Sequence, residues 1–133
     1  MSDNQLFDQW HRIIKRGDLL AARALVDSGC DVNCRNRFGW TLLMLAAGEG
    51  NASLVEYLVS RGADVNATND FGVSALAYAA LQGECKAIRK LLDSGASVEV
   101  LPHGFTLLEF AGWGPGQDRT KRHFDLLRQA GAV

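Results

Sequence analysis

The sequence predicts an all-α fold in which similar helix-turn-helix units stack side by side into a solenoid. One observation is that glycines recur 33 residues apart in two series, which are Gly17, Gly50, Gly83 and Gly116, and Gly29, Gly62 and Gly95. The other is that apolar residues between these glycines are spaced as on one face of a helix. Self-similarity at a fixed period of this length is typical of repeat architectures.

The bulk composition indicates one globular domain. The 133 residues are 47% hydrophobic and 22% charged, a balance typical of folded chains. With a net charge of -1, the chain has no overall field that would attract a phosphate backbone. Two small basic groups, residues 12–16 and 119–122, are interpreted as solvated helix faces. We therefore expect no nucleic-acid partner.

The distribution of apolar residues and cysteines predicts a soluble, cytoplasmic protein. No stretch approaches the roughly 18 consecutive apolar residues that a membrane span requires, and the first 30 residues lack the apolar core of a signal peptide. Cys30, Cys34 and Cys85 are odd in number and lack the spacing of a secreted disulfide framework. We expect reduced thiols and no membrane partner.

The repeat is strongest in the middle of the chain. Residues 36–68 and 69–101 align without gaps, with identities at Asn36/Asn69, Phe38/Phe71, Gly39/Gly72, Leu43/Leu76, Ala46/Ala79, Ala47/Ala80, Gly50/Gly83, Leu58/Leu91, Gly62/Gly95, Ala63/Ala96 and Val65/Val98. Residues 3–35 match more weakly, as a terminal capping unit does. Residues 102–133 form the other predicted cap, with an inserted loop at 114–118 whose composition is rich in glycine and proline.

The first half of each unit predicts a turn followed by a helix. In the second unit, residues 38–40 form a turn that needs glycine, and Thr41 can cap the first free N–H groups of the helix. Leu43, Ala46 and Ala47 then share one helix face. Gly50 is predicted to end this helix in a left-handed conformation.

The second half of each unit predicts another helix. Leu54, Val55, Leu58 and Val59 continue an apolar stripe, and Gly62 ends it. A unit of this length cannot bury the apolar faces of both helices alone. The units must therefore stack.

These motifs resemble the ankyrin repeat over nearly the whole chain. The matching segments are Gly39-x-Thr41-x-Leu43, Ala46-Ala47-x-x-Gly50, Leu54-Val55-x-x-Leu58-Val59 and Gly62-Ala63-Asp64-Val65-Asn66. The resemblance implies helix-turn-helix units joined by β-turn finger loops. The family's helix opening Thr-Pro-Leu-His is not kept, since this chain has Thr41-Leu42-Leu43-Met44, Ser74-Ala75-Leu76-Ala77 and Thr106-Leu107-Leu108-Glu109. The family's inter-repeat histidine hydrogen bonds are therefore not expected.

The two terminal units carry residues that suit caps. Trp10, Ile13 and Ile14 replace the smaller residues of the inner units, and Glu109, Arg119 and Lys121 add charge at the other end. We expect both ends to shield apolar faces from water.

The resemblance also implies a partner-binding surface, because turn tips and the exposed ends of first helices form the family's concave face. Here those positions hold Arg37, Phe38, Trp40, Glu49, Asp70, Phe71, Val73, Leu81, Gln82, His103, Phe105 and Trp113. Loop tips normally carry small polar residues, so the aromatics predict an exposed apolar strip of interface anchors. The alternative is that the turn aromatics tuck under their own turns.

No combination of residues predicts a catalytic, cofactor or metal site. The candidate nucleophiles and bases, which are the three cysteines and His11, His103 and His123, lie in no catalytic motif. Cys30 and Cys34 lack a second ligand pair for zinc. The glycine-rich residues 112–116 lack the Lys-Ser/Thr of a phosphate-binding loop. Asp31, Asp64, Asp93 and Glu56 occupy turn or outward-facing positions rather than a cleft.

These observations predict a non-enzymatic protein-protein interaction module, monomeric when free, that acts as a stoichiometric inhibitor, adaptor, assembly factor or immunity-type protein. Two alternatives stay open at this point. One is a thiol-dependent enzyme or redox protein that uses Cys34 or Cys85. The other is a scaffold that self-associates through its open end or its aromatic strip.

Overall fold

The computed structural model describes residues 3–98, 106–111 and 120–131. In this part the helices are α1 (Asp3–Arg16), α2 (Leu19–Asp27), α3 (Leu42–Gly48), α4 (Ala52–Ser60), α5 (Ala75–Gln82), α6 (Cys85–Asp93), α7 (Leu107–Ala111) and α8 (Thr120–Gln129). The described residues form no strand, only isolated bridges between Arg35 and Thr41 and between Thr68 and Ser74. The predicted all-α fold is confirmed.

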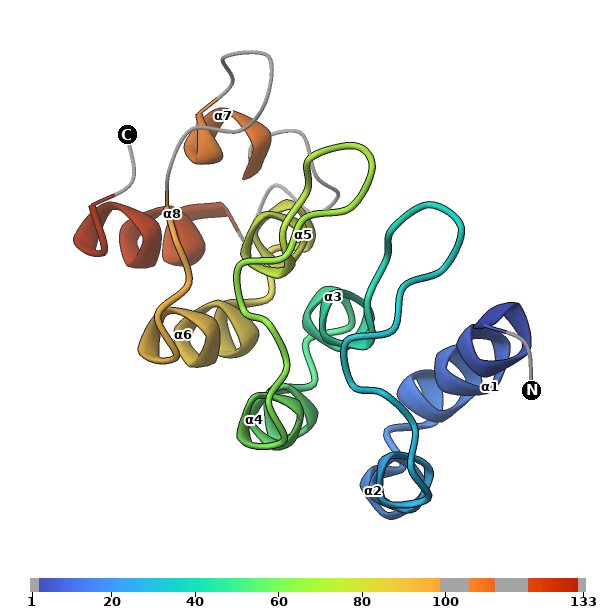
Figure 1. Cartoon of the computed structure of the whole chain (residues 1–133). Coiled ribbons are helices and arrows are strands. Elements are labelled where there is room, and N and C mark those ends of the chain that lie inside the picture. Colours follow the sequence, from blue (N-terminus) through green and yellow to red (C-terminus); the bar gives the residue numbers. More distant parts are fainter. Residues whose placement is uncertain (1–2, 99–105, 112–119, 132–133) are drawn as a thin grey trace.

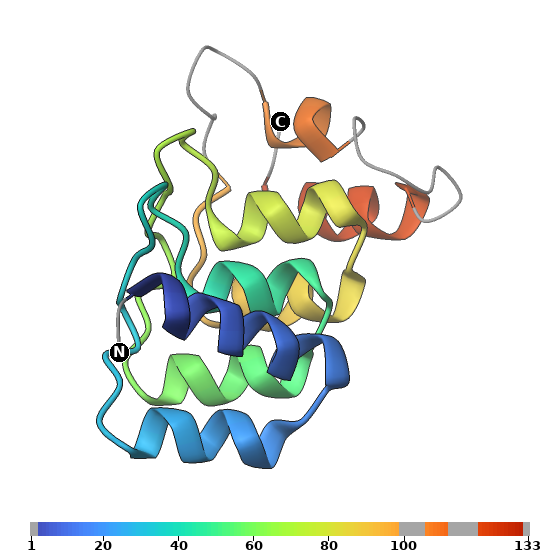
Figure 2. The same cartoon turned by 90° about the vertical axis from the view of Figure 1, so that its right-hand side faces the viewer.

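The helices form two layers (Figure 1). Helices α1, α3, α5 and α7 lie in the inner layer and α2, α4, α6 and α8 in the outer one. Within each layer, neighbours along the stack pack on one another, as α3 does on α5 and α4 on α6. The loops that lead into α3 and α5 project together from one side of the stack, which Figure 2 shows from a second direction.

Side-chain caps start the helices where the sequence predicts. Thr41 Oγ1 accepts a hydrogen bond from the Met44 amide at 3.3 Å, and Ser74 Oγ accepts one from the Ala77 amide at 3.1 Å. Such caps each stabilise a helix by about 1 kcal/mol. Helix α3 ends with Glu49 as its C-cap, and Gly50 follows in the predicted left-handed conformation at φ 75°.

One apolar core runs through the stack. Leu43 and Leu76, the equivalent leucines of the two central units, are each 1% exposed, and Ala46 and Ala79 are fully buried. The alanines let neighbouring inner helices approach closely, because their side chains add little bulk between the backbones.

The first helix seals one end of this core. Trp10 is fully buried, and its Nε1–H donates to the carbonyl oxygen of Leu42 at 3.2 Å. Ile14 is buried and Ile13 half-buried. At the other end Glu109 is exposed, as expected, whereas Arg119 and Lys121 lie outside the described side chains.

Asparagine side chains join successive units in the segments that follow α2 and α4. Asn33 Nδ2 donates to the carbonyl of Gly62 at 3.1 Å, and Asn33 Oδ1 accepts from the Asp64 amide at 2.8 Å. Asn66 repeats the arrangement one unit later, donating to Gly95 at 3.4 Å and accepting from the Ser97 amide at 2.7 Å. Each asparagine therefore donates one hydrogen bond to the backbone about one unit further along the chain and accepts one from it, which links neighbouring units.

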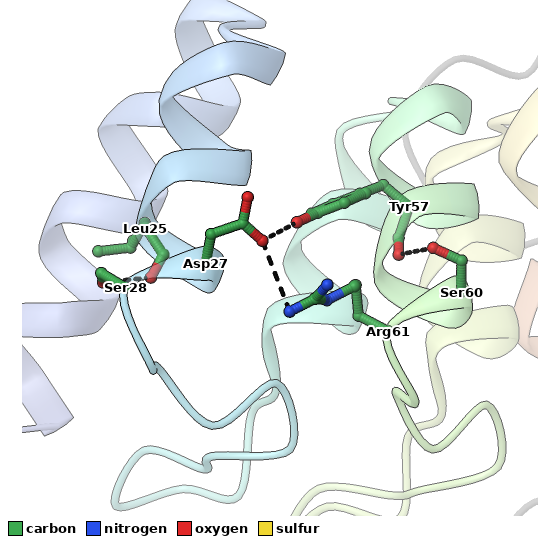
Figure 3. Close-up of polar contacts among 6 residues, drawn as sticks. All are labelled: Leu25, Asp27, Ser28, Tyr57, Ser60 and Arg61. Carbon is green, nitrogen blue, oxygen red and sulfur yellow. Dashed lines mark hydrogen bonds and ion pairs between the residues drawn. The ribbon is translucent and has the colours of Figure 1, made fainter.

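Polar contacts also link the outer helices (Figure 3). The Tyr57 hydroxyl on α4 donates to Asp27 Oδ1 on α2 at 2.9 Å, and the Arg61 guanidinium lies 3.5 Å from the same oxygen. The pKa of Tyr57 is raised, mainly by partial desolvation and to a smaller extent by this hydrogen bond to Asp27. Because Asp27 and Arg61 are exposed, their ion pair contributes little to stability.

Candidate protein-binding face

Two loops of the same design stand beside the inner helices, and we name them finger 1 (residues 35–41) and finger 2 (residues 68–74). An asparagine organises each finger from inside. Asn36 Oδ1 accepts hydrogen bonds from the amides of Phe38 at 2.9 Å and Trp40 at 3.0 Å. In this way one side chain replaces the backbone pairing that a short loop cannot make.

The second finger repeats this bonding around Asn69. Its Oδ1 accepts from the amides of Phe71 at 2.9 Å and Val73 at 3.0 Å. Asn69 is only 5% exposed, and its Nδ2 group has no hydrogen-bond partner. Finger 2 thus contains a buried donor that the described part of the chain leaves unsatisfied.

The two fingers are bound to each other. The Asp70 amide donates to the carbonyl of Phe38 at 3.0 Å, and the Arg35 guanidinium donates to the carbonyl of Thr68. Gly39 lies at φ 82° between them, and a Cβ there would be 2.8 Å from Asp70 Oδ1. Only glycine adopts this positive φ without strain and also leaves room for Asp70, so a glycine here lets the two fingers lie this close together.

The finger tips carry exposed aromatic rings. Phe38 is 45% exposed and Phe71 64% exposed, and their ring centroids lie 6.4 Å apart at an interplanar angle of 32°. The Arg37 guanidinium lies 4.8 Å from the centroid of the Phe38 ring. The expected exposure is therefore confirmed for these two phenylalanines, and the alternative that they tuck under their own turns is wrong.

Trp40 departs from the expectation of a solvent-facing anchor. It is half-buried, and its ring packs edge-on against Tyr78 of α5, with centroids 4.8 Å apart and planes at 70°. The physical reason is that Trp40 lies at the base of finger 1, within reach of Tyr78, rather than at the tip. Tyr78 in turn occupies the space beside Gly48, where any Cβ would collide with its ring.

A hollow of about 320 Å³ opens where finger 1 meets the inner helices. Its walls come from α1, finger 1, α3 and α5, and comprise Phe7, Asp8, His11, Asn36, Phe38, Trp40, Leu45 and Tyr78. Sequence reasoning found Phe38 and Trp40 but missed the contributions of the helices. Tyr78 had a signal in the sequence, since it lies three residues before the predicted Leu81, one helical turn away.

The remaining predicted residues differ in exposure. Glu49 and Asp70 are exposed, as is Arg37. Val73, Leu81 and Gln82 are half-buried. His103, Phe105 and Trp113 lie outside the described residues.

A second cavity of about 600 Å³ lies on the other layer, along the groove between α6 and α8. Its lining includes residues of both charges: the cationic residues are Lys86, Arg89 and Lys90, and the anionic residues are Asp93 and Asp125. Lys90 also pairs with Glu56 at 3.2 Å. The mixture of charges selects no class of ligand.

The three cysteines are free thiols, each half-buried. The pKa of Cys30 is raised, mainly by burial and also by the nearby charge of Asp31. A hydrogen bond with the Cys34 side chain acts in the opposite direction but does not cancel this rise. A thiol with a raised pKa is a poor nucleophile at neutral pH, because the thiolate is the reactive form.

Among the described residues, no group of three or more histidines, cysteines, aspartates and glutamates lies close enough together to hold a metal ion. None of the helices described is both long enough and apolar enough to cross a membrane.

Comparison with known proteins finds similarity to ankyrin repeats. The family model described as ankyrin repeats (3 copies) matches residues 10–101. A mouse (Mus musculus) protein, "Ankyrin repeat, SAM and basic leucine zipper domain-containing protein 1", is 38% identical over 50 residues, which are 38% of this chain. The similarity covers 10% of that mouse protein, so it concerns a small part of its length.

Proposed function

The chain belongs to the ankyrin-repeat family, and from this premise we propose that it binds a partner protein with the face formed by fingers 1 and 2 and the inner helices, the concave face. Ankyrin repeats are generally protein-protein interaction modules.

The single observation that carries the proposal is the exposed pair Phe38 and Phe71 at the two finger tips. Exposed aromatic rings at loop tips lose unfavourable contact with water when a partner covers them. Aromatic residues and arginine are also the side chains most enriched among residues that dominate binding energy. Arg37, which stacks on Phe38, supplies the arginine at the same place.

The rigidity of the fingers supports the same conclusion. Contacts of Asp70 and Arg35 hold the fingers together before any partner arrives. A surface that is already ordered loses less conformational entropy on binding. We include Glu49, Val73, Leu81, Gln82, His103, Phe105 and Trp113 in the proposed contact surface, along with the finger residues.

We further propose a stoichiometric role, as an inhibitor, adaptor, assembly factor or immunity-type protein, in a reducing compartment such as the cytoplasm. Three free cysteines suit a compartment that keeps thiols reduced.

A capture experiment tests the proposal. The chain is immobilised and exposed to an extract of its native source, in parallel with the Phe38→Ser/Phe71→Ser double variant and with the outer-face variant Glu56→Ala. We expect a protein that is retained by the unmodified chain and by Glu56→Ala but lost from the double variant. Retention by the double variant combined with loss from Glu56→Ala would place the partner on the outer helices instead. Light scattering at two concentrations separates partner binding from self-association.

A further inference from the structure

The hollow beside finger 1 has an unusual lining for a surface depression. Its lining includes four aromatic residues, Phe7, Phe38, Trp40 and Tyr78, together with Asp8 and His11. No lysine or arginine is among its lining residues. The aromatic side chains come from three separate elements, so the fold gathers them at one place.

The free faces of these rings can attract a cation to the hollow. The face of an aromatic ring carries partial negative charge and attracts cations within about 6 Å of its centroid. Trp40 and Tyr78 meet at 70°, so their rings form two sides of a corner. Phe38 already binds a cation in this way, since the Arg37 guanidinium lies 4.8 Å from its centroid.

Asp8 adds a formal negative charge. Its carboxylate makes no ion pair with any of the described side chains, and the nearby Arg12 donates from Nε to the backbone carbonyl of Asp8 at 3.3 Å instead. Asp8 is exposed, so an apolar side chain that entered the hollow would gain nothing from this carboxylate, whereas a cationic side chain would gain a modest, salt-sensitive attraction to it.

We propose that this hollow receives a lysine or arginine side chain of the partner protein, with its aliphatic stem along the aromatic rings and its charged group at Asp8. The volume of about 320 Å³ is at the lower end of the range of small-ligand pockets, which suits one long side chain. The assignment rests on the proposed function, because it names the side chain that the partner presents to the concave face.

Nuclear magnetic resonance titration of the full, ¹⁵N-labelled chain tests the assignment. The probes are four capped tripeptides with glycine at both ends and lysine, arginine, norleucine or glutamate in the centre, used at neutral pH and constant ionic strength. We expect the largest shifts at the Trp40 indole N–H and at the amides of Asp8 and Tyr78. The lysine and arginine peptides should bind about fivefold more tightly than the norleucine peptide.

Two variants separate the carboxylate from general charge. Asp8→Asn should remove most of the preference for lysine over norleucine, and Glu56→Gln, which removes a distant exposed carboxylate, should leave it unchanged. Both residues are exposed, so both variants should keep the spectrum of the folded chain. Equal or tighter binding of the norleucine peptide overturns the assignment, as does the absence of shifts at these three residues with every peptide.

The outcomes distinguish this assignment from the proposed function. If finger variants abolish partner capture but Asp8→Asn leaves it unchanged and the peptides show no cation preference, the assignment alone fails. If the cation preference depends on Asp8 but the Phe38→Ser/Phe71→Ser double variant still captures every partner, the cation site stands and the proposed function fails.

Discussion

The ring of Trp40 lies edge-on against the ring of Tyr78, with 4.8 Å between their centroids. Trp40 belongs to finger 1, and Tyr78 belongs to α5 of the following unit. The contact therefore fixes a finger to the inner helix of its neighbour. One consequence is that the same rings both hold the stack together and line the proposed binding hollow.

Replacement of Trp40 by alanine should destabilise the fold. The change removes a partly buried indole and an aromatic pair, so we expect the free energy of unfolding to fall by about 1 to 3 kcal/mol. Urea denaturation followed by circular dichroism measures this change. The matched variant Trp40→Phe should recover part of the loss, and a change below about 0.5 kcal/mol for Trp40→Ala would mean that the contact with Tyr78 contributes nothing.

Replacement of Phe71 by alanine should separate binding from stability. Its ring is 64% exposed, and exposed substitutions usually change stability by less than about 0.5 kcal/mol. Against a captured partner, we expect the loss of an aromatic anchor to weaken binding by about 2 kcal/mol, or roughly thirtyfold in Kd. Calorimetric titration gives the Kd, and thermal unfolding gives the control. Unchanged affinity would remove Phe71 from the binding face.

The order of the helices and their starting points could be predicted from the sequence because they depend on local chemistry. Thr41 and Ser74 cap the helices that follow them, and Gly50 takes a left-handed conformation. The ties made by Asn33 and Asn66 could not be predicted in this way. Each joins backbone groups about 30 residues further along the chain, so only the stacked arrangement brings the partners together.

The candidate site was predicted less completely, for a similar reason. Phe38 and Phe71 repeat at the same position of two units, which made the exposed tips visible in the sequence. Phe7 and Asp8 lie on α1, which continues as a helix where the inner units have a finger, so no repeat pattern marks them. The turn Phe38-Gly39-Trp40 predicts both aromatic residues at the tip, but the ring of Trp40 packs against Tyr78 instead.

The Cys30 thiol should react slowly at neutral pH. Burial raises its pKa, and a raised pKa means that the protonated, unreactive form persists to higher pH than in an unfolded chain. A thiol reagent should therefore label Cys30 faster as pH rises into the alkaline range, and faster in urea than in buffer at every pH below that. Mass spectrometry of the labelled peptides identifies the site. Rapid labelling of native Cys30 at neutral pH would contradict this prediction.

The unsatisfied Nδ2 group of Asn69 leads to a prediction about finger 2. Asn69→Ala removes the acceptor for the amides of Phe71 and Val73 and should cost about 1 to 3 kcal/mol of unfolding free energy. Asn69→Asp keeps an acceptor oxygen for both amides and removes the orphaned donor. Its hydrogen bonds become charge-assisted and stronger, although the carboxylate must be buried. We therefore expect Asn69→Asp to be more stable than Asn69→Ala by at least about 1 kcal/mol at neutral pH.

Acidification should reverse part of that difference. Burial raises the pKa of such a carboxylate and its two backbone N–H bonds lower it, and we expect the bonds to outweigh burial, so that the folded pKa is lowered. Its stabilising effect is therefore present above the ordinary aspartate pKa and is lost as pH falls through the folded pKa. Urea denaturation at neutral and at acidic pH measures both variants, and Asn36→Asp in finger 1 is the matched control because Asn36 has the same two amide partners in its own loop. Equal stabilities of Asn69→Asp and Asn69→Ala at neutral pH would show that burial of the carboxylate cancels the bonds that it makes.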